Sequence, residues 1–133
     1  MKQTHADHIR AANEALLADG SLGAVAEYFA PTYLAHIGGR ARKGHRFIKS
    51  FVNDIRASFP DLRVDVEILL CKGDRVAWQR TLRGTHRAEF KGFPPTGRKI
   101  TWHDMVVSRF EDGLIAEDWA ISDLAEQLLA KRV

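Results

Sequence analysis

With 133 residues, of which 45% are hydrophobic, the chain fits one compact domain spanning residues 1–133 and leaves no room for a second. The net charge of +3 is modest, and the basic segment between Arg40 and Arg46 lacks stacking aromatics, which favours a solvated basic loop over a nucleic-acid partner. No apolar run approaches the roughly 20 residues of a membrane span, and Met1–His5 lacks the core of a secretory signal, so we expect a cytoplasmic protein without a membrane partner.

The first third of the chain predicts two helices and a short extended piece. Thr4 is placed to cap a first helix whose apolar residues recur at helical spacing until Asp19-Gly20. Ser21 is placed to cap a short second helix, which Pro31 should end. An extended piece over 32–36 then leads into the Gly38-Gly39 loop.

The middle of the chain gives the clearest helical pattern. Apolar residues recur at intervals of three and four from about Gly44, and the helix should end before Pro60. From Leu62 the period changes to two, which predicts a strand packed on helices from one side as far as Leu70. Cys71 at its end is the only cysteine, so it excludes an internal disulfide, and we interpret it as buried filler.

Three more strands and a helix are predicted towards the C-terminus. Strands over 75–86 and 99–110 flank a segment rich in glycine and proline. The short turn Glu111-Asp112-Gly113 predicts a hairpin, so residues 114–122 should return antiparallel. Asp123 is placed to cap a final helix. Helices followed by consecutive strands predict an α+β fold, in which a curved antiparallel sheet wraps the N-terminal helices into a cone-shaped barrel.

The most distinctive segment is residues 84–98, which contains Gly84-Thr85-His86 and the run Phe90–Arg98 and reads as an ordered lip over a cavity. Together with other short motifs, its spacing resembles the SnoaL-like polyketide cyclase family of the nuclear transport factor 2-like superfamily over about residues 5–130. The other motifs are Phe59-Pro60-Asp61, Glu111-Asp112-Gly113, Glu117, Trp119 and Asp123.

The resemblance implies a cystatin-like cone with an apolar cavity, pairing of sheets in a homodimer, and a hydrophobic aromatic or polyketide-like small molecule as ligand. The family chemistry is an intramolecular aldol closure of a polyketide ester without metal or cofactor. The six histidines fit this absence of a metal site, because they form neither an HExxH nor a paired-cysteine arrangement. No glycine-rich phosphate loop follows a strand either.

The predicted strand over 99–110 holds the best candidates for acid–base chemistry in a pocket. Asp104 shares one strand face with Trp102 and Ser108, the mixture expected of an apolar cavity with few polar anchors. Asp104 is therefore the first candidate for a catalytic carboxylate, unless it forms a structural ion pair with Arg80 or Arg109. Arg80 could itself bind a substrate carbonyl or carboxylate.

The resemblance adds further candidates. Positions matching His36 and His86 commonly face the cavity in SnoaL-like proteins, so either could carry a proton, with His86 as a catalytic and His36 as a substrate-binding candidate. Lone histidines are, however, more often core or rim residues. The aromatic polyketide cyclases carry a catalytic aspartate where this chain has Ala120, so that mechanism does not transfer unchanged. Asp118 shares the strand parity of Ala120 and is a candidate replacement.

Aromatic residues complete the predicted substrate site. Trp78, Phe90, Phe93 and Trp102 could stack on a planar substrate or be ordinary core residues, and the resemblance adds Trp119. We interpret the chain as a polyketide cyclase. The alternatives are a cofactor-independent hydroxylase of the same fold and a non-catalytic binding or dimerisation module, which Ala120 favours.

Overall fold

The structure is a computed structural model that describes residues 4–130; residues 1–3 and 131–133 of the expected domain, with most of the N-terminal stretch examined for a signal, lie outside the described residues. The elements follow in the order α1 (His5–Asn13), η1 (Glu14–Ala18), η2 (Leu22–Ala24), α2 (Val25–Tyr28), β1 (Phe29–Ile37), β2 (Arg40–Lys43), α3 (Gly44–Ser58), β3 (Arg63–Lys72), β4 (Arg75–Thr85), β5 (Lys99–Glu111), β6 (Leu114–Ser122) and α4 (Leu124–Leu129). None of the described helices is long and apolar enough to cross a membrane.

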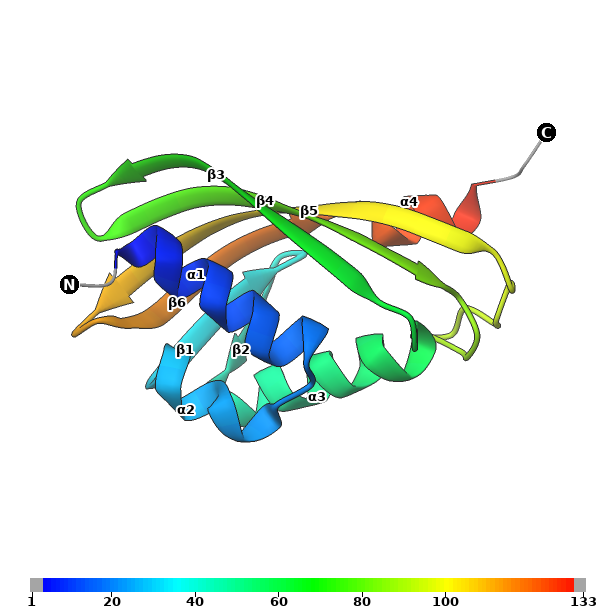
Figure 1. Cartoon of the computed structure of the whole chain (residues 1–133), viewed down its shortest axis with the longest axis horizontal. Coiled ribbons are helices and arrows are strands. Elements are labelled where there is room, and N and C mark those ends of the chain that lie inside the picture. Colours follow the sequence, from blue (N-terminus) through cyan, green and yellow to red (C-terminus); the bar gives the residue numbers. More distant parts are fainter. Residues whose placement is uncertain (1–3, 131–133) are drawn as a thin grey trace.

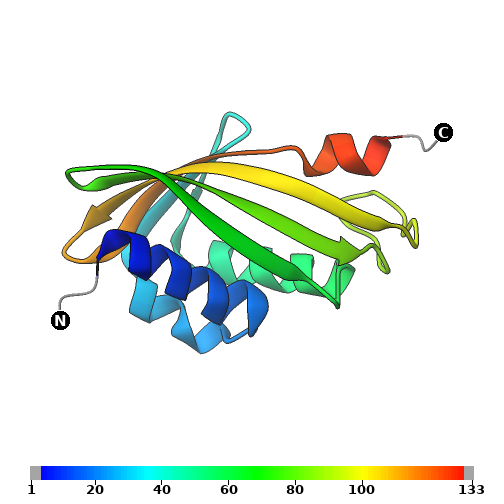
Figure 2. The ribbon, with the colours of Figure 1, turned by 45° about the horizontal axis from the view of Figure 1, so that its top comes forward.

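One curved, unclosed sheet holds six strands in the order β2-β1-β6-β5-β4-β3. The helices α1, α2 and α3 lie under its concave face, while α4 lies apart from them near one end of β5 (Figures 1 and 2). The predicted α+β fold is confirmed. One pair differs from an all-antiparallel sheet, since β1 runs parallel to β6. β1 reaches the sheet directly from a helix rather than through a hairpin, so no turn forces it to run antiparallel to β6.

The first helix begins as predicted, with the Asp7 backbone N–H donating to Thr4 Oγ1 at 3.0 Å. It continues into η1, whose last carbonyls, those of Leu17 and Ala18, accept hydrogen bonds of 2.7 and 2.9 Å from the Arg56 guanidinium of α3. Ser21 makes no side-chain cap, contrary to the prediction. Because carbonyls at a helix end lack partners of their own, Arg56 fixes α3 against the end of η1.

Two predicted boundaries near the start of the sheet are wrong. The second helix ends at Tyr28, before Pro31, because the chain is already extended from Phe29 and pairs with β6. Arg40–Lys43 of the basic segment form an exposed edge strand, β2, rather than a loop, and the rest of the segment belongs to α3. Strand pairing between distant segments decides both boundaries, and local propensity does not reveal it.

A β-bulge interrupts β3 between Ile68, which pairs with Trp78, and Leu70, which pairs with Ala77. The extra residue reverses the alternation, so that Leu70 is 64% exposed instead of facing the helices. Cys71, close to the turn at the end of β3, is exposed as well, which contradicts its interpretation as buried filler.

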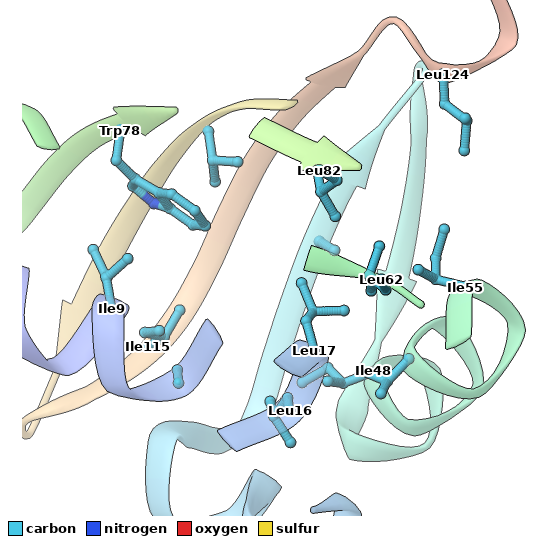
Figure 3. Close-up of a cluster of buried hydrophobic side chains, with 14 of the residues drawn as sticks. Ile9, Leu16, Leu17, Ile48, Ile55, Leu62, Trp78, Leu82, Ile115 and Leu124 are labelled. Carbon is cyan, nitrogen blue, oxygen red and sulfur yellow. The ribbon is translucent and has the colours of Figure 1, made fainter. Parts of the chain in front are cut away.

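The hydrophobic core fills the space between the concave face and the helices. Figure 3 shows Trp78 and Leu82 from β4, Ile9 and Leu17 from the first helical segment, and Ile48 and Ile55 from α3 converging there. The faces predicted for two central strands are confirmed: Val76, Trp78 and Leu82 are buried on β4, as are Trp102 through Phe110 at alternate positions on β5.

Gly84 lies within β4, so the lip predicted over residues 84–98 begins later than expected. A Cβ atom at this position would lie 2.8 Å from the Cβ of Phe59, which is fully buried at the end of α3. The absence of a side chain therefore allows α3 to approach the sheet. The neighbouring Thr85 is fixed by Asp61, which accepts hydrogen bonds from its backbone N–H at 2.7 Å and its hydroxyl at 2.8 Å.

We expect Gly84→Ala to lower the free energy of unfolding by about 1–3 kcal/mol, because the methyl group overpacks against Phe59. Urea denaturation would measure the change. Gly23→Ala is the matched control, since a Cβ there meets nothing within 4 Å. Equal stabilities of the two variants would contradict this account of the α3 contact.

Candidate functional site

A cavity opens between the helices and the concave face of the sheet. It has a volume of about 130 Å³. Most of its lining is apolar, from α1, η1, α3 and the inward side of β1, β4, β5 and β6. Five polar residues interrupt this lining: Asn13, Tyr33, Arg80, Asp118 and Ser122. An apolar cleft with a few converging polar groups is the usual form of a small-molecule site.

Asp118 on β6 is the centre of the polar contacts. Tyr33 on β1 donates its hydroxyl to Asp118 Oδ2 at 2.6 Å, and Ser108 on β5 donates to Oδ1 at 2.5 Å. The Trp78 indole N–H on β4 donates to Ser108 Oγ at 2.9 Å. Strands β1 and β5 thus each supply a donor to a carboxyl group on β6, and β4 contacts it through Ser108.

Burial raises the pKa of the Asp118 carboxyl, while the hydrogen bonds from Ser108 and Tyr33 and the charge of Arg80 oppose that shift. The pKa of Tyr33 is raised well above its ordinary value, first by burial and then by the nearby Asp118. Tyr33 therefore stays protonated and acts as a donor. A carboxyl group whose pKa is raised in an apolar cavity is suited to exchange protons with a bound ligand.

Arg80 brings the second charge into the cavity. Its Nε donates to Asp104 Oδ2 at 2.7 Å, and its Nη1 donates to Asn13 Oδ1 at 3.0 Å. The guanidinium carbon lies 5.4 Å from the Trp78 ring centroid and 5.6 Å from that of Phe51. These contacts hold a cation against aromatic faces on the cavity wall.

The structure brings together three of the predicted site residues, Trp78, Arg80 and Asp118, in the cavity lining. Asp104 is buried on the same face and forms the ion pair that was left open as its alternative role. It does not contribute to the cavity lining, and its Oδ1 has no hydrogen-bond partner among the described residues.

A second group of predicted residues gathers at the lip end of the sheet. His86, within the lip segment, is fully buried and stacks on Phe59 with ring centroids 5.3 Å apart. Trp102 packs on Phe59 from β5 at 4.6 Å. Phe90 and Phe93 close a tight turn through paired backbone hydrogen bonds of 3.0 and 2.8 Å. None of these residues lines the cavity, so the lip does not lie over it.

His36 and Trp119 lie on the outer face of the sheet, defined here as the side away from α1 and α3. Their rings stack at 5.2 Å, and His36 Nε2 lies 2.6 Å from Glu117 Oε2. Both border a shallow groove on this face and not the cavity. The parity of β6 explains this, because Asp118 and Ala120 point inward and Trp119 points outward.

Sequence reasoning missed Tyr33 and Asn13. Tyr33 lies near the start of the predicted extended piece, whose pairing with another strand was not predicted. Its alternation with Ala35, which is also buried on β1, was the available signal. Asn13 lies four residues after Ile9 on the apolar helix face, and this polar residue in an apolar stripe was the available signal. Within residues 4–130, no group of three or more His, Cys, Asp or Glu side chains could hold a metal ion.

The comparisons with known proteins concern both sequence and fold. The family model described as SnoaL-like polyketide cyclase matches residues 6–130. No curated protein matches the chain.

Several solved structures are similar over nearly the whole chain. IdmH from Streptomyces antibioticus, a proposed polyketide cyclase, is 32% identical, with 95% of this chain and 96% of that chain covered and a TM-score of 0.81. AclR from Streptomyces galilaeus, a proposed hydroxylase, is 26% identical, with 95% of each chain covered and a TM-score of 0.78. A proposed polyketide cyclase from Acidithiobacillus ferrooxidans is 27% identical, covers 91% and 89%, and has a TM-score of 0.79.

His86 gives a testable pH dependence. Burial lowers the pKa of its imidazole from 6.5, and the nearby Arg98 adds to that shift. The Thr96 backbone N–H donates to His86 Nδ1 at 3.3 Å, a contact that only the neutral ring can accept. Below pH 6.5 the unfolded chain therefore binds more protons at this residue than the folded chain, and stability falls as the pH falls.

We expect the free energy of unfolding of the wild type to decrease more between pH 7 and pH 5 than that of His86→Gln, which cannot titrate. Urea denaturation at several pH values in this range would measure both. An equal decrease in the variant would assign the acid sensitivity to other groups.

Proposed function

This chain belongs to the SnoaL-like polyketide cyclase family, and we propose that it is a small-molecule enzyme in which Asp118 is the acid–base group. The observation that carries this proposal is the carboxyl group of Asp118, which lines an apolar cavity with a raised pKa and accepts hydrogen bonds on both oxygens. Asp118 would replace the aspartate that the family resemblance expects at Ala120. Both residues lie on the cavity side of β6.

The reaction proposed is an intramolecular aldol closure of a small, flat, largely apolar polyketide ester. The Asp118 carboxylate removes a proton from a carbon between two carbonyl groups, which gives an enolate. The enolate carbon forms a bond to another carbonyl carbon of the same molecule, and the resulting alkoxide takes the proton back from Asp118. Atoms balance without a metal, a cofactor or an oxidant.

The remaining cavity residues would bind and orient the substrate. Arg80 is the cation available to stabilise the enolate oxygen, and Asp104 would act through it by fixing its position. Trp78 and Phe51 offer aromatic faces to a planar molecule. Holding the flexible chain in a folded conformation supplies a large part of the rate enhancement in such a reaction.

A cofactor-independent hydroxylase is the second candidate, and the similarity to AclR, a proposed hydroxylase, favours it. The two reactions differ in their products. Aldol closure leaves the mass of the substrate unchanged or lowers it by one water, whereas hydroxylation adds one oxygen atom and consumes dioxygen. A non-catalytic binding module would bind the same compounds without converting them.

We also propose that the protein is a homodimer that pairs through the outer face. Exposed apolar side chains there include Leu69, Met105 and Ile121, the last 77% exposed. Arg109 and Glu117, 3.1 Å apart, place both signs of charge on the same surface, so that two copies related by a two-fold axis can be complementary in charge. An apolar patch rimmed by charges is typical of a protein interface.

We expect Asp118→Asn to lower kcat by about 10²–10⁴-fold on any compound that the wild type converts, because the amide cannot take up a proton. Ligand affinity should stay within a few-fold. A panel of polyketide methyl esters and cyclic ketones, followed by absorbance and product mass, would measure both. Asp123→Asn is the matched control, because that carboxylate lies outside the cavity and accepts a backbone hydrogen bond from His103. Full activity of Asp118→Asn would refute the proposed role.

For the assembly, we expect the wild type to be a dimer by light scattering at micromolar concentration, and Ile121→Glu to be a monomer, because a charge would be buried in the interface. Leu129→Glu places the same charge on an exposed apolar position of α4, away from the sheet surface, and should remain dimeric. A monomeric wild type would exclude this assembly.

A further inference from the structure

The hydrogen bonds on one side of Asp118 have a fixed direction. An indole N–H can only donate, so Ser108 Oγ accepts from Trp78 Nε1 over the 2.9 Å that separates them. The single hydroxyl hydrogen of Ser108 is then directed to Asp118 Oδ1. Ser108 is fully buried, so solvent offers the hydroxyl no alternative partner.

The other oxygen of the carboxylate is held independently. Tyr33 approaches from β1 and donates to Oδ2 at 2.6 Å. Each carboxylate oxygen thus keeps one lone pair for a protein donor and one for a ligand. The orientation of the carboxyl plane is fixed from two strands that lie on opposite sides of β6 in the sheet.

We propose that Trp78 and Ser108 are positioning residues, which form a directed hydrogen-bond relay that orients the Asp118 carboxylate towards the cavity and favours its ionised form. This inference rests on the proposed function, because it concerns the same acid–base group. It extends that function by giving Trp78 two roles, since its ring lines the cavity while its N–H begins the relay.

The relay opposes the effect of burial on Asp118. Burial disfavours the carboxylate, and each donated hydrogen bond favours it. A hydrogen bond to a charged group contributes more than one between neutral groups, so the loss of the Ser108 donor should raise the pKa of Asp118 by roughly one pH unit. The protein would then lose its base at a higher pH.

The test needs no substrate. Carbon-13 NMR of the aspartate carboxyl groups gives the titration midpoint of Asp118, which is assigned by its absence in Asp118→Asn. We expect the midpoint to rise by about one pH unit in Ser108→Ala and to stay near the wild-type value in Ser108→Thr, which keeps the hydroxyl. Thr101→Ala, a hydroxyl deletion at an exposed position of β5, is the matched control and should leave the midpoint unchanged.

Two further measurements keep the proposal testable if Ser108→Ala does not fold. Trp78→Phe retains an aromatic ring but removes the N–H, and it should raise the same midpoint by a smaller amount. In the wild type, the Trp78 indole N–H resonance should shift with the same midpoint as Asp118, whereas that of Trp102 should not. The relay would be overturned by an unchanged Asp118 midpoint in a folded Ser108→Ala variant. A Trp78 indole N–H resonance that does not shift as Asp118 titrates would overturn it too.

These results separate the relay from the proposed function. If the relay is present but no compound is converted, the proposed catalysis fails and the relay stands. If a substrate is found and Ser108→Ala retains the wild-type pH profile of kcat, the relay fails while Asp118 remains the base. If both hold, the acidic limb of that profile moves to higher pH together with the carboxyl titration.

Discussion

Arg80 carries a positive charge in a largely apolar environment, and this charge needs polar partners. The arrangement of side chains on the concave face depends on this requirement. The Arg80 guanidinium reaches Asp104 on β5 and Asn13 on α1 and lies near the rings of Trp78 and Phe51. A charge that is mostly removed from water must be paired, and breaking a buried pair by removing one partner costs about 3–5 kcal/mol. The requirement couples the first helix, the third helix and the centre of the sheet to one cation. It also leaves a positive charge beside Asp118, where a reaction that forms an enolate needs it.

The concave face is divided between two kinds of environment. Near Asp118, polar groups converge on open space from neighbouring strands. Near His86, the same sheet is closed by Phe59, Trp102 and the lip, and the buried ring nitrogen Nε2 has no partner among the described residues. Both ends bury an ionisable group, but only the first offers it to a ligand. The proposed chemistry and the structural closure therefore lie at different positions along the same strands.

The sequence was sufficient for the fold class, for the long helix α3 and for the faces of β4 and β5, because regular periodicity is a local property that reports which side is buried. It was insufficient where pairing with a distant segment decides. The bulge in β3 exposed Leu70, and the parallel partner of β1 brought Tyr33 to Asp118. For the candidate site, residue type and parity predicted Trp78 and Arg80, and the family resemblance together with parity predicted Asp118. The family resemblance pointed to His36 and Trp119, which the parity of their strands places on the opposite face from the cavity.

The sheet that separates the cavity from the outer groove is a single layer of backbone. Trp78, Val106 and Ala120 border both hollows, and the side chain of Ala120 is only a methyl group. The rear wall of the cavity is thus thin, and its stiffness depends on what lies behind it. A second molecule that covers the outer groove would make this wall more rigid. The shape selectivity of the cavity would then be a property of the assembled protein rather than of the isolated chain.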